Sequence, residues 1–148
     1  MAVFVTGRIL LDTNIFIDYL RAGRHAAMVL GGRHSLLRFL SAVVLLELRI
    51  GADTPRRIRA VDRIEEAFPS ERIVAPTAAL FSRAGTLFRA IHGAGSGIRD
   101  RLSPMNDLLI ALTAWQIGAK VVTSDASDFA RIAERLPGLT IVDMRGEI

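Results

Sequence analysis

The sequence predicts an α/β fold in which a mostly parallel sheet is covered by helices on both faces. Short apolar runs alternate with helical patterns along the chain of 148 residues, and this alternation is typical of parallel sheets. The hydrophobic fraction of 51% is enough to build a buried core. Cysteine is absent, which excludes a disulfide scaffold and indicates a reducing compartment. We expect one domain over residues 1–148, with its core between about residues 8 and 143.

Five short apolar segments are expected to form the strands of this sheet. Continuous apolar runs of this length are typical of strands that are buried on both faces of a parallel sheet. Each run stops where polar or turn-forming residues begin, which sets its expected end. The five segments are Arg8–Asp12, Leu37–Ser41, Arg72–Ala75, Ala119–Thr123 and Leu139–Asp143.

Six further segments show helical spacing of their apolar residues. Ser41 is expected to cap the second of these helices and Ser103 the fifth. Gly51 and Gly118 are expected to end the same two helices. The second helix is apolar nearly all round, which predicts that it is buried. The six segments are Asn14–Arg21, Ala42–Ile50, Thr54–Phe68, Pro76–Ile91, Met105–Ile117 and Phe129–Leu136.

The charged residues indicate which ligands the protein could bind and in which compartment it is expected. The formal net charge is +4, and every basic residue except Lys120 is an arginine. A guanidinium offers forked donors to phosphate oxygens, so this bias suits a phosphate-binding surface, although a genome-wide preference for arginine explains it equally well. Arg8 and Asp12 interrupt the N-terminal stretch, unlike a secretory signal. The longest apolar run, Ala42–Leu46, is too short to span a membrane. These features predict a soluble cytoplasmic protein.

Glu47 is an acidic residue without a local partner. Its neighbours at helical spacing are Val43, Val44, Ile50 and Gly51, so no nearby cation offsets the cost of burying its charge. A buried ion pair with an arginine distant in sequence is one explanation. A role in binding a metal ion is the other.

Three more carboxylates occupy positions that suit a functional site. Asp107 repeats the pattern of Glu47 in another helix, although the helix dipole also favours an aspartate in a first turn. Asp12 and Asp125 each follow a predicted strand, and the functional crevice of a parallel sheet lies beyond the carboxyl ends of its strands. Each of them could instead cap a turn or helix, as could Asp128. Together, the four acids need a common cation, and oxygen ligands favour Mg²⁺ or Mn²⁺.

Four sequence strings carry these acids, and together they resemble a known family. They are similar to the four acidic motifs of the PIN domain, and more closely to those of the VapC-type ribonuclease toxins of bacterial toxin–antitoxin pairs. The resemblance is collinear from Ile9 to Val142. No single string is specific, but four in this order are. The strings are Leu10-Leu11-Asp12-Thr13-Asn14, Val43-Val44-Leu45-Leu46-Glu47-Leu48, Asn106-Asp107-Leu108-Leu109-Ile110-Ala111 and Val122-Thr123-Ser124-Asp125-Ala126-Ser127-Asp128-Phe129.

The resemblance implies a three-layer α/β/α sandwich on a parallel sheet of about five strands. It also implies an endoribonuclease that depends on Mg²⁺ or Mn²⁺, pairs with an antitoxin protein and forms a homodimer. The expected catalytic residues and metal ligands are Asp12, Glu47, Asp107 and Asp125. The residues expected to support them are Thr13, Asn14, Thr123 and Asp128. Whether Asp125 or Asp128 is the fourth ligand stays open, because the last motif contains both.

Basic residues beside a glycine-rich segment are candidates for binding RNA. The segment Gly93–Gly97 leads toward the Asp107 helix, and a flexible loop flanked by arginines can form a phosphate-binding rim. A solvated helix face is an equally open explanation. The candidate arginines are Arg83, Arg89, Arg99 and Arg101.

Two other classes of function are compatible with the acids. The first comprises a small metal-dependent phosphatase and a phospho-acceptor receiver. For the phosphatase, Asp12-Thr13-Asn14 lacks the second carboxylate of an Asp-x-Asp phosphatase motif. A phospho-acceptor receiver would also need a lysine after its strand, whereas Lys120 precedes one. The second alternative is a catalytically silent PIN fold that only binds RNA or a partner, and the presence of all four acids argues against it.

Overall fold

A five-stranded sheet with the order β3-β2-β1-β4-β5 lies at the centre of the molecule. The computed structural model describes residues 5–32, 35–93 and 102–145. All neighbouring strands are parallel, which confirms the predicted sheet. The strands are β1 (Gly7–Leu11), β2 (Leu36–Ser41), β3 (Ile73–Val74), β4 (Lys120–Thr123) and β5 (Ile141–Asp143).

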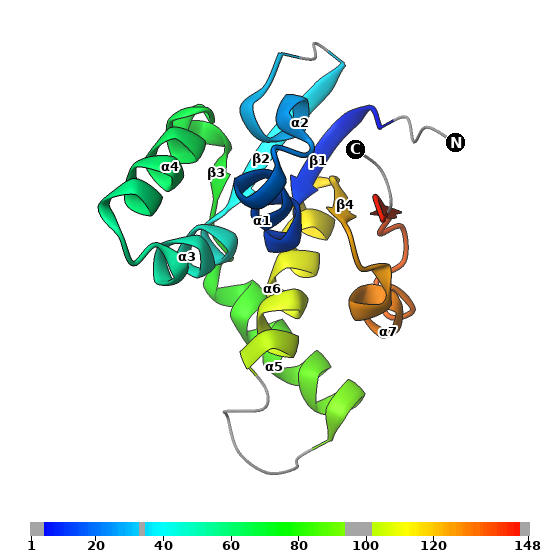
Figure 1. The fold of residues 1–148 in the computed structure, drawn as a ribbon. Helices are drawn as coiled ribbons and strands as arrows, with labels where there is room; N and C mark the ends of the chain where they lie inside the picture. The colour runs from blue at the N-terminus through cyan, green and yellow to red at the C-terminus, as the bar shows by residue number, and fades with distance from the viewer. Residues whose placement is uncertain (1–4, 33–34, 94–101, 146–148) are drawn as a thin grey trace.

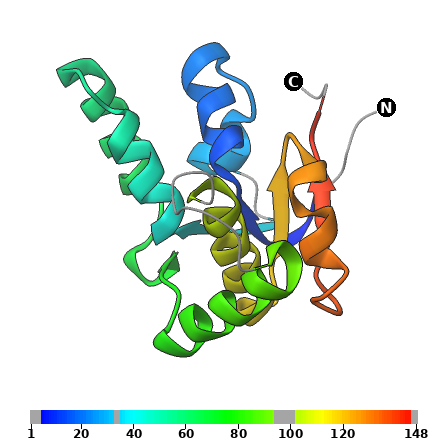
Figure 2. The same cartoon turned by 90° about the horizontal axis from the view of Figure 1, so that it is seen from below.

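Helices cover both faces of the sheet and complete the predicted three-layer α/β/α sandwich. Helices α1 and α2 lie on one side of the sheet, and α5 and α6 lie on the other (Figure 1, Figure 2). The α-helices are α1 (Thr13–Ala22), α2 (Ala26–Leu30), α3 (Ala42–Gly51), α4 (Pro55–Glu66), α5 (Ala78–His92), α6 (Leu102–Ile117) and α7 (Ala130–Ala133), and two 3-10 helices, η1 (Ser70–Arg72) and η3 (Ala126–Phe129), accompany them.

The order of the strands creates a switch point between β1 and β4. From β1 the chain adds β2 and β3 on one side, and it then returns to add β4 and β5 on the other side. Right-handed crossovers that run in opposite directions place their helices on opposite faces of the sheet. The loops that leave β1 and β4 therefore diverge, and a crevice forms where ligands of such sheets bind. Asp12 follows β1 directly, and Ser124 and Asp125 follow β4.

The core is built from apolar side chains of the central strands and of the helix faces that pack on them. Ile9, Leu10 and Leu11 of β1 are fully buried, as expected for a strand covered on both faces. The ring of Phe16 in α1 contacts that of Phe68, which follows α4, with centroids 6.3 Å apart. Of the described helices, none combines the length and apolar character that crossing a membrane requires.

Helix α3 differs from the prediction that it is buried all round. One face, which includes Val44 and Leu48, is buried against the rest of the protein, but Leu46 is 57% and Ile50 is 74% exposed. The apolar sequence of a helix shows how much surface it could bury, whereas the neighbouring elements decide how much is covered. Arg49 ties this helix to α4 by ion pairs with Asp62 and Glu65.

Helix α6 begins earlier than the sequence predicts. Ser103 is its second residue and not its cap, because the helix starts at Leu102. Pro104 is tolerated there, since the first four N–H groups of a helix have no intrahelical acceptor. Asp107 is consequently the sixth residue of α6, beyond the first turn. The helix dipole therefore does not account for its charge.

Candidate active site

Asp12 is a buried carboxylate at the carboxyl end of β1. It is only 5% exposed, because it follows the buried residue Leu11 and caps α1. Its Oδ1 accepts a hydrogen bond from the backbone N–H of Thr13 at 2.8 Å, and its Oδ2 accepts one from the hydroxyl of Thr123 at 2.9 Å. Burial nevertheless raises the pKa of Asp12 from 3.8 to about 6, against the lowering effect of these hydrogen bonds. Asp12 therefore caps α1, and the raised pKa of the same carboxyl group makes it a candidate for a chemical role.

Glu47 lies on α3 and is oriented by a residue of α1. The hydroxyl of Thr13 donates a hydrogen bond to Oε1 of Glu47 at 2.9 Å. This contact joins the first and second acidic motifs, which are 34 residues apart. The alternative explanation for Glu47, an ion pair with a distant arginine, is not found among the described residues. The charge of Glu47 contributes instead to raising the pKa values of Asp12 and Asp107.

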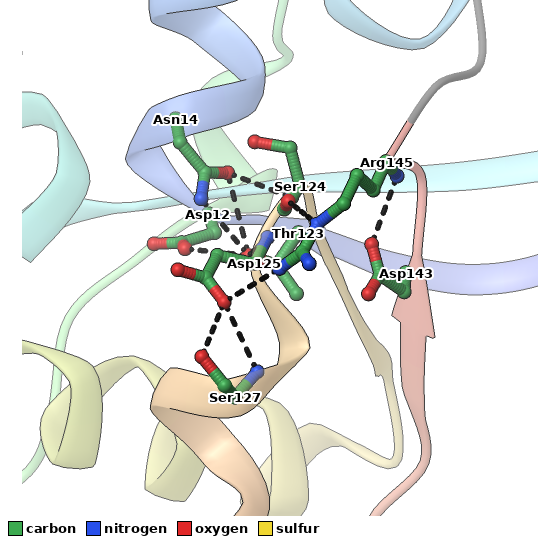
Figure 3. A network of polar contacts seen from close by, with 8 residues as sticks. All are labelled: Asp12, Asn14, Thr123, Ser124, Asp125, Ser127, Asp143 and Arg145. Atoms are coloured by element: carbon green, nitrogen blue, oxygen red, sulfur yellow. Dashed lines mark hydrogen bonds and ion pairs between the residues drawn. The ribbon is translucent and has the colours of Figure 1, made fainter.

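Thr123 connects the first and the last acidic motif through its buried hydroxyl (Figure 3). The hydroxyl donates to Asp12, and it accepts hydrogen bonds from Nδ2 of Asn14 at 3.0 Å and from the backbone N–H of Asp125 at 3.1 Å. Asn14 also accepts a hydrogen bond from the backbone N–H of Ser124 through its Oδ1. The supporting residues Thr123 and Asn14 therefore hold the ends of β1 and β4 together.

Asp107 has the most perturbed carboxyl group of the site. Desolvation raises its pKa from 3.8 to about 8, and the negative charges of the other acids add to this effect. Their contributions decrease in the order Asp12, Asp128, Glu47, Asp125. All four predicted acids, together with Asp128, therefore lie within electrostatic reach of one another. We refer to these five side chains as the acidic cluster.

The two acids of the last motif have different surroundings. Hydrogen bonds from Ser127 and the nearby charge of Arg145 hold the pKa of Asp125 below its ordinary value. Burial and the charge of Asp125 raise the pKa of Asp128. Asp128 also acts more strongly on Asp107 than Asp125 does, and it contributes to the raised pKa of Asp12. The charge of Asp128 thus acts on the buried carboxyl groups of Asp12 and Asp107. Asp125 is instead bound by Ser127 and Arg145 at the exposed edge of the acidic cluster, which we call the rim.

Arg145 is a site residue that the sequence analysis missed. It follows β5, and its guanidinium lies 2.9 Å from Oδ1 of Asp125 (Figure 3). In the described part of the chain it is the only cation that forms an ion pair with a member of the acidic cluster. The available signal was a basic residue just beyond the last strand, at the sheet edge that carries Asp12 and Asp125.

The acidic cluster suits a hard divalent cation by the chemistry of its donors, which are all carboxylate oxygens. Among residues 5–32, 35–93 and 102–145, no three acidic or histidine side chains are placed to hold one metal ion as they stand. Burial is the main cause of the raised pKa of Asp107, and the negative charges of the other acids add to it. These charges repel one another, and a bound cation would offset the repulsion.

A cavity of about 750 Å³ opens beside the acidic cluster. Thr13 and Glu47 line it, together with other residues of α1, α3 and α4 and of the segment between α3 and α4. Arg21 and Arg56 line this cavity, so positive charge is present next to the acids.

Two of the arginines that were candidates for binding RNA, Arg83 and Arg89, are located away from the acidic cluster. The guanidinium of Arg83 lies over the ring of Trp115, 4.5 Å from its centroid. Arg89 lines an apolar cavity of about 350 Å³ between α5 and α6. Arg99 and Arg101 lie outside the described residues. Neither Arg83 nor Arg89 pairs with a described member of the acidic cluster, and a role of these arginines in RNA binding stays a prediction.

Comparisons with known proteins place this arrangement in a family. A model of the PIN domain matches residues 9–135. A search of curated proteins finds no match. The structure of VapBC-1 from nontypeable Haemophilus influenzae is similar, with 24% sequence identity, a TM-score of 0.63 and coverage of 93% of this chain and 98% of that chain.

Two other solved structures show the same fold. FitAcB from Neisseria gonorrhoeae is 25% identical, with a TM-score of 0.60, and 91% of this chain and 96% of that chain are covered. A toxin–antitoxin complex from Klebsiella pneumoniae is 21% identical, with a TM-score of 0.62 and coverage of 89% and 95%. The family model spans most of the chain, including Asp12, Glu47, Asp107 and Asp125. The chain therefore belongs to the PIN domain family.

Proposed function

We propose that this protein is a metal-dependent endoribonuclease and the toxin of a toxin–antitoxin pair. The observation that carries the proposal is the acidic cluster at the switch point of the sheet, where burial and, to a smaller extent, the charges of the other four acids raise the pKa of Asp107. Clusters of carboxylates that cannot all stay ionised without a cation are suited to metal-assisted cleavage of phosphodiesters. Membership of the PIN family and similarity to structures of toxin–antitoxin complexes support the same function.

The residues of the chain have separate tasks in this reaction. Asp12, Glu47 and Asp107 would hold Mg²⁺ or Mn²⁺, with Asp128 or Asp125 as the fourth acid. The bound ion supplies positive charge that activates a water molecule and offsets the charge of the phosphate. Thr13 orients Glu47, and Thr123 orients Asp12 through the hydrogen bonds described above. Water attacks the phosphorus and the bond to the 3′ oxygen breaks, which leaves a 5′-phosphate and a 3′-hydroxyl.

Cleavage of a short structured RNA in the presence of Mg²⁺ tests this function directly. We expect endonucleolytic products whose new 5′ ends carry phosphate, and no cleavage when the divalent cation is removed with a chelator. Analysis of the end groups separates mechanisms, because a 2′,3′-cyclic phosphate requires attack by the 2′-hydroxyl and would contradict the proposed route. Hydrolysis of p-nitrophenyl phosphate without RNA cleavage would support a phosphatase instead, and RNA retention without cleavage would support a silent binding module.

The toxin assignment makes a separate prediction about growth. Expression of the protein alone is expected to arrest the growth of a bacterial host, because RNA cleavage would continue without a neutralising partner. The Asp12→Ala variant is expected to abolish the arrest, and growth curves with immunoblots for equal expression measure both. Unaffected growth in cells that contain folded protein with nuclease activity would contradict the toxin role while leaving the nuclease role intact.

Exposed apolar side chains support the proposed partners, an antitoxin and a second copy of this chain. Leu46 and Ile50 on α3, Ile58 on α4 and Phe81 on α5 are between 44% and 74% exposed. Apolar groups that lie together on a surface are often covered by a partner. An antitoxin could inhibit by placing a basic side chain against the acidic cluster, where it would replace the charge of the metal ion.

A further inference from the structure

The backbone of Arg145 is held at the same sheet edge as the acidic cluster. In the β4–β5 pair, Thr123 lies opposite Asp143. The next residue, Met144, is buried and donates its backbone N–H to the carbonyl oxygen of Thr123 at 2.7 Å. The backbone N–H of Arg145 donates to Oδ1 of Asp143 at 2.8 Å. These contacts position Arg145 directly beyond the strand end, next to the residues that follow β4.

Two hydrogen bonds orient the side chain of Arg145, and its guanidinium has further N–H donors. Its Nη2 donates to Oδ1 of Asp125 at 2.9 Å, and its Nε donates to the carbonyl oxygen of Ser124 at 3.4 Å. A guanidinium has five N–H donors, and described residues engage two of those of Arg145 and leave three. The side chain is 66% exposed. The unused donors are therefore accessible to a ligand at the rim of the acidic cluster.

The contact with Arg145 leaves one oxygen of Asp125 available for the predicted role of this carboxylate as a metal ligand. Oδ1 of Asp125 accepts from the backbone N–H and the hydroxyl of Ser127 as well as from Arg145. Oδ2 of Asp125 accepts no hydrogen bond from any described residue. Arg145 can therefore stay in place while Oδ2 contacts another group, so its position does not block the site.

A nucleic-acid strand needs positive charge at this rim. Its phosphates would approach five carboxylates, and a metal ion offsets only part of the resulting repulsion. Among the described residues, only Arg145 is both ion-paired to the acidic cluster and largely exposed. A planar guanidinium binds phosphate oxygens in a forked geometry, which a point charge such as a lysine ammonium cannot reproduce.

We propose that Arg145 binds a phosphate of the nucleic-acid substrate next to the acidic cluster, an inference that rests on the proposed nuclease function. Asp125, Ser124 and Asp143 orient the guanidinium and the backbone that carries it. Arg145 thus extends the site from the strand ends of β1 and β4 to the end of β5. Because phosphate contacts carry no base information, we expect its effect to be independent of RNA sequence.

Binding of single-stranded RNA tests this role. The background is the Asp107→Asn variant, which we expect to bind RNA without cleaving it, and the probe is an end-labelled RNA of mixed sequence. Adding Arg145→Ala is expected to weaken binding about tenfold. The slope of log K against log salt concentration should decrease by about 0.7, the value for one lost phosphate contact on a single strand. Arg145→Lys should keep the slope, because the charge remains, and lose part of the affinity.

Arg135 provides the matched control, since it is an exposed arginine that precedes β5 and so lies away from the rim. Arg135→Ala should change neither the affinity nor the salt slope, and melting temperatures confirm that each variant is folded. An unchanged affinity and slope for Arg145→Ala would overturn the proposal. So would a lower Mg²⁺ requirement for cleavage by Arg145→Ala in the otherwise wild-type protein, because Arg145 would then compete with the cation. If the wild type neither binds nor cleaves RNA, the nuclease function fails as well.

Discussion

Asp107→Asn is expected to reduce RNA cleavage by about 1000-fold, because it removes a carboxylate that we propose as a metal ligand from the acidic cluster. Loss of several kcal/mol of charge stabilisation corresponds to a factor of this size. The substitution keeps the size and shape of the side chain, so the loss is not attributable to packing. Cleavage rates at saturating Mg²⁺ under single-turnover conditions provide the measurement.

The same variant is expected to be more stable than the wild type when divalent cations are removed. The pKa of Asp107 is about 8 in the folded protein, against an ordinary value of 3.8. The folded protein therefore holds this proton more tightly than the unfolded chain does, and wild-type stability falls as the pH rises between these two values. Asparagine does not titrate. The advantage of the variant is thus absent below pH 3.8 and grows as the pH rises to about 8. Because the carboxyl group is only partly buried, solvent screening reduces the full effect of the pKa difference to on the order of 2 kcal/mol.

Urea unfolding in the presence of a chelator, at both ends of this pH range, measures the difference. Addition of Mg²⁺ should then raise the melting temperature of the wild type more than that of Asp107→Asn, because ligand binding stabilises only the state that binds it. Glu66→Gln is a suitable control, since Glu66 is an exposed acid at the end of α4. An Asp107→Asn variant that cleaves RNA at the wild-type rate would refute the role of this residue.

The placement of the acids could be predicted from the sequence because it follows from local patterns. An apolar run that ends in Asp12 indicates a buried strand with a carboxylate at its end, and parallel strands share one carboxyl edge. The neighbours of Glu47 three and four positions away in its own helix include no cation. Both inferences need only the period of the side chains and the direction of the strands.

Features that depend on contacts between distant segments could not be predicted in this way. Arg145 reaches Asp125 only because β5 pairs with β4 in one register, and no local pattern encodes that register. The exposure of Leu46 and Ile50 depends on which elements pack against α3. Helix α2 has only five residues, too few to show a helical period.

Thr123→Val is expected to reduce cleavage by about 10–100-fold, the usual effect of removing a group that orients a metal ligand. Valine keeps the shape of threonine, but it cannot donate to Asp12 or accept from Asn14 and the backbone of Asp125. Three buried or half-buried polar groups lose a partner, which should cost about 1–3 kcal/mol of stability. Loss of the hydroxyl also raises the pKa of Asp12 further, because that hydrogen bond lowers it.

Two further variants separate this effect from a change in packing. Thr123→Ser retains the hydroxyl and should restore most of the activity, although it loses a buried methyl group. Thr113→Val makes the same chemical change at a threonine that is also buried, but whose hydroxyl donates to the carbonyl oxygen of Leu109 within α6. It should leave the cleavage rate near that of the wild type. Equal cleavage rates for Thr123→Val and Thr113→Val would show that the hydroxyl of Thr123 does not position Asp12. The hydrogen bonds of Thr123 predict the other outcome, in which only Thr123→Val loses activity and Thr123→Ser regains it.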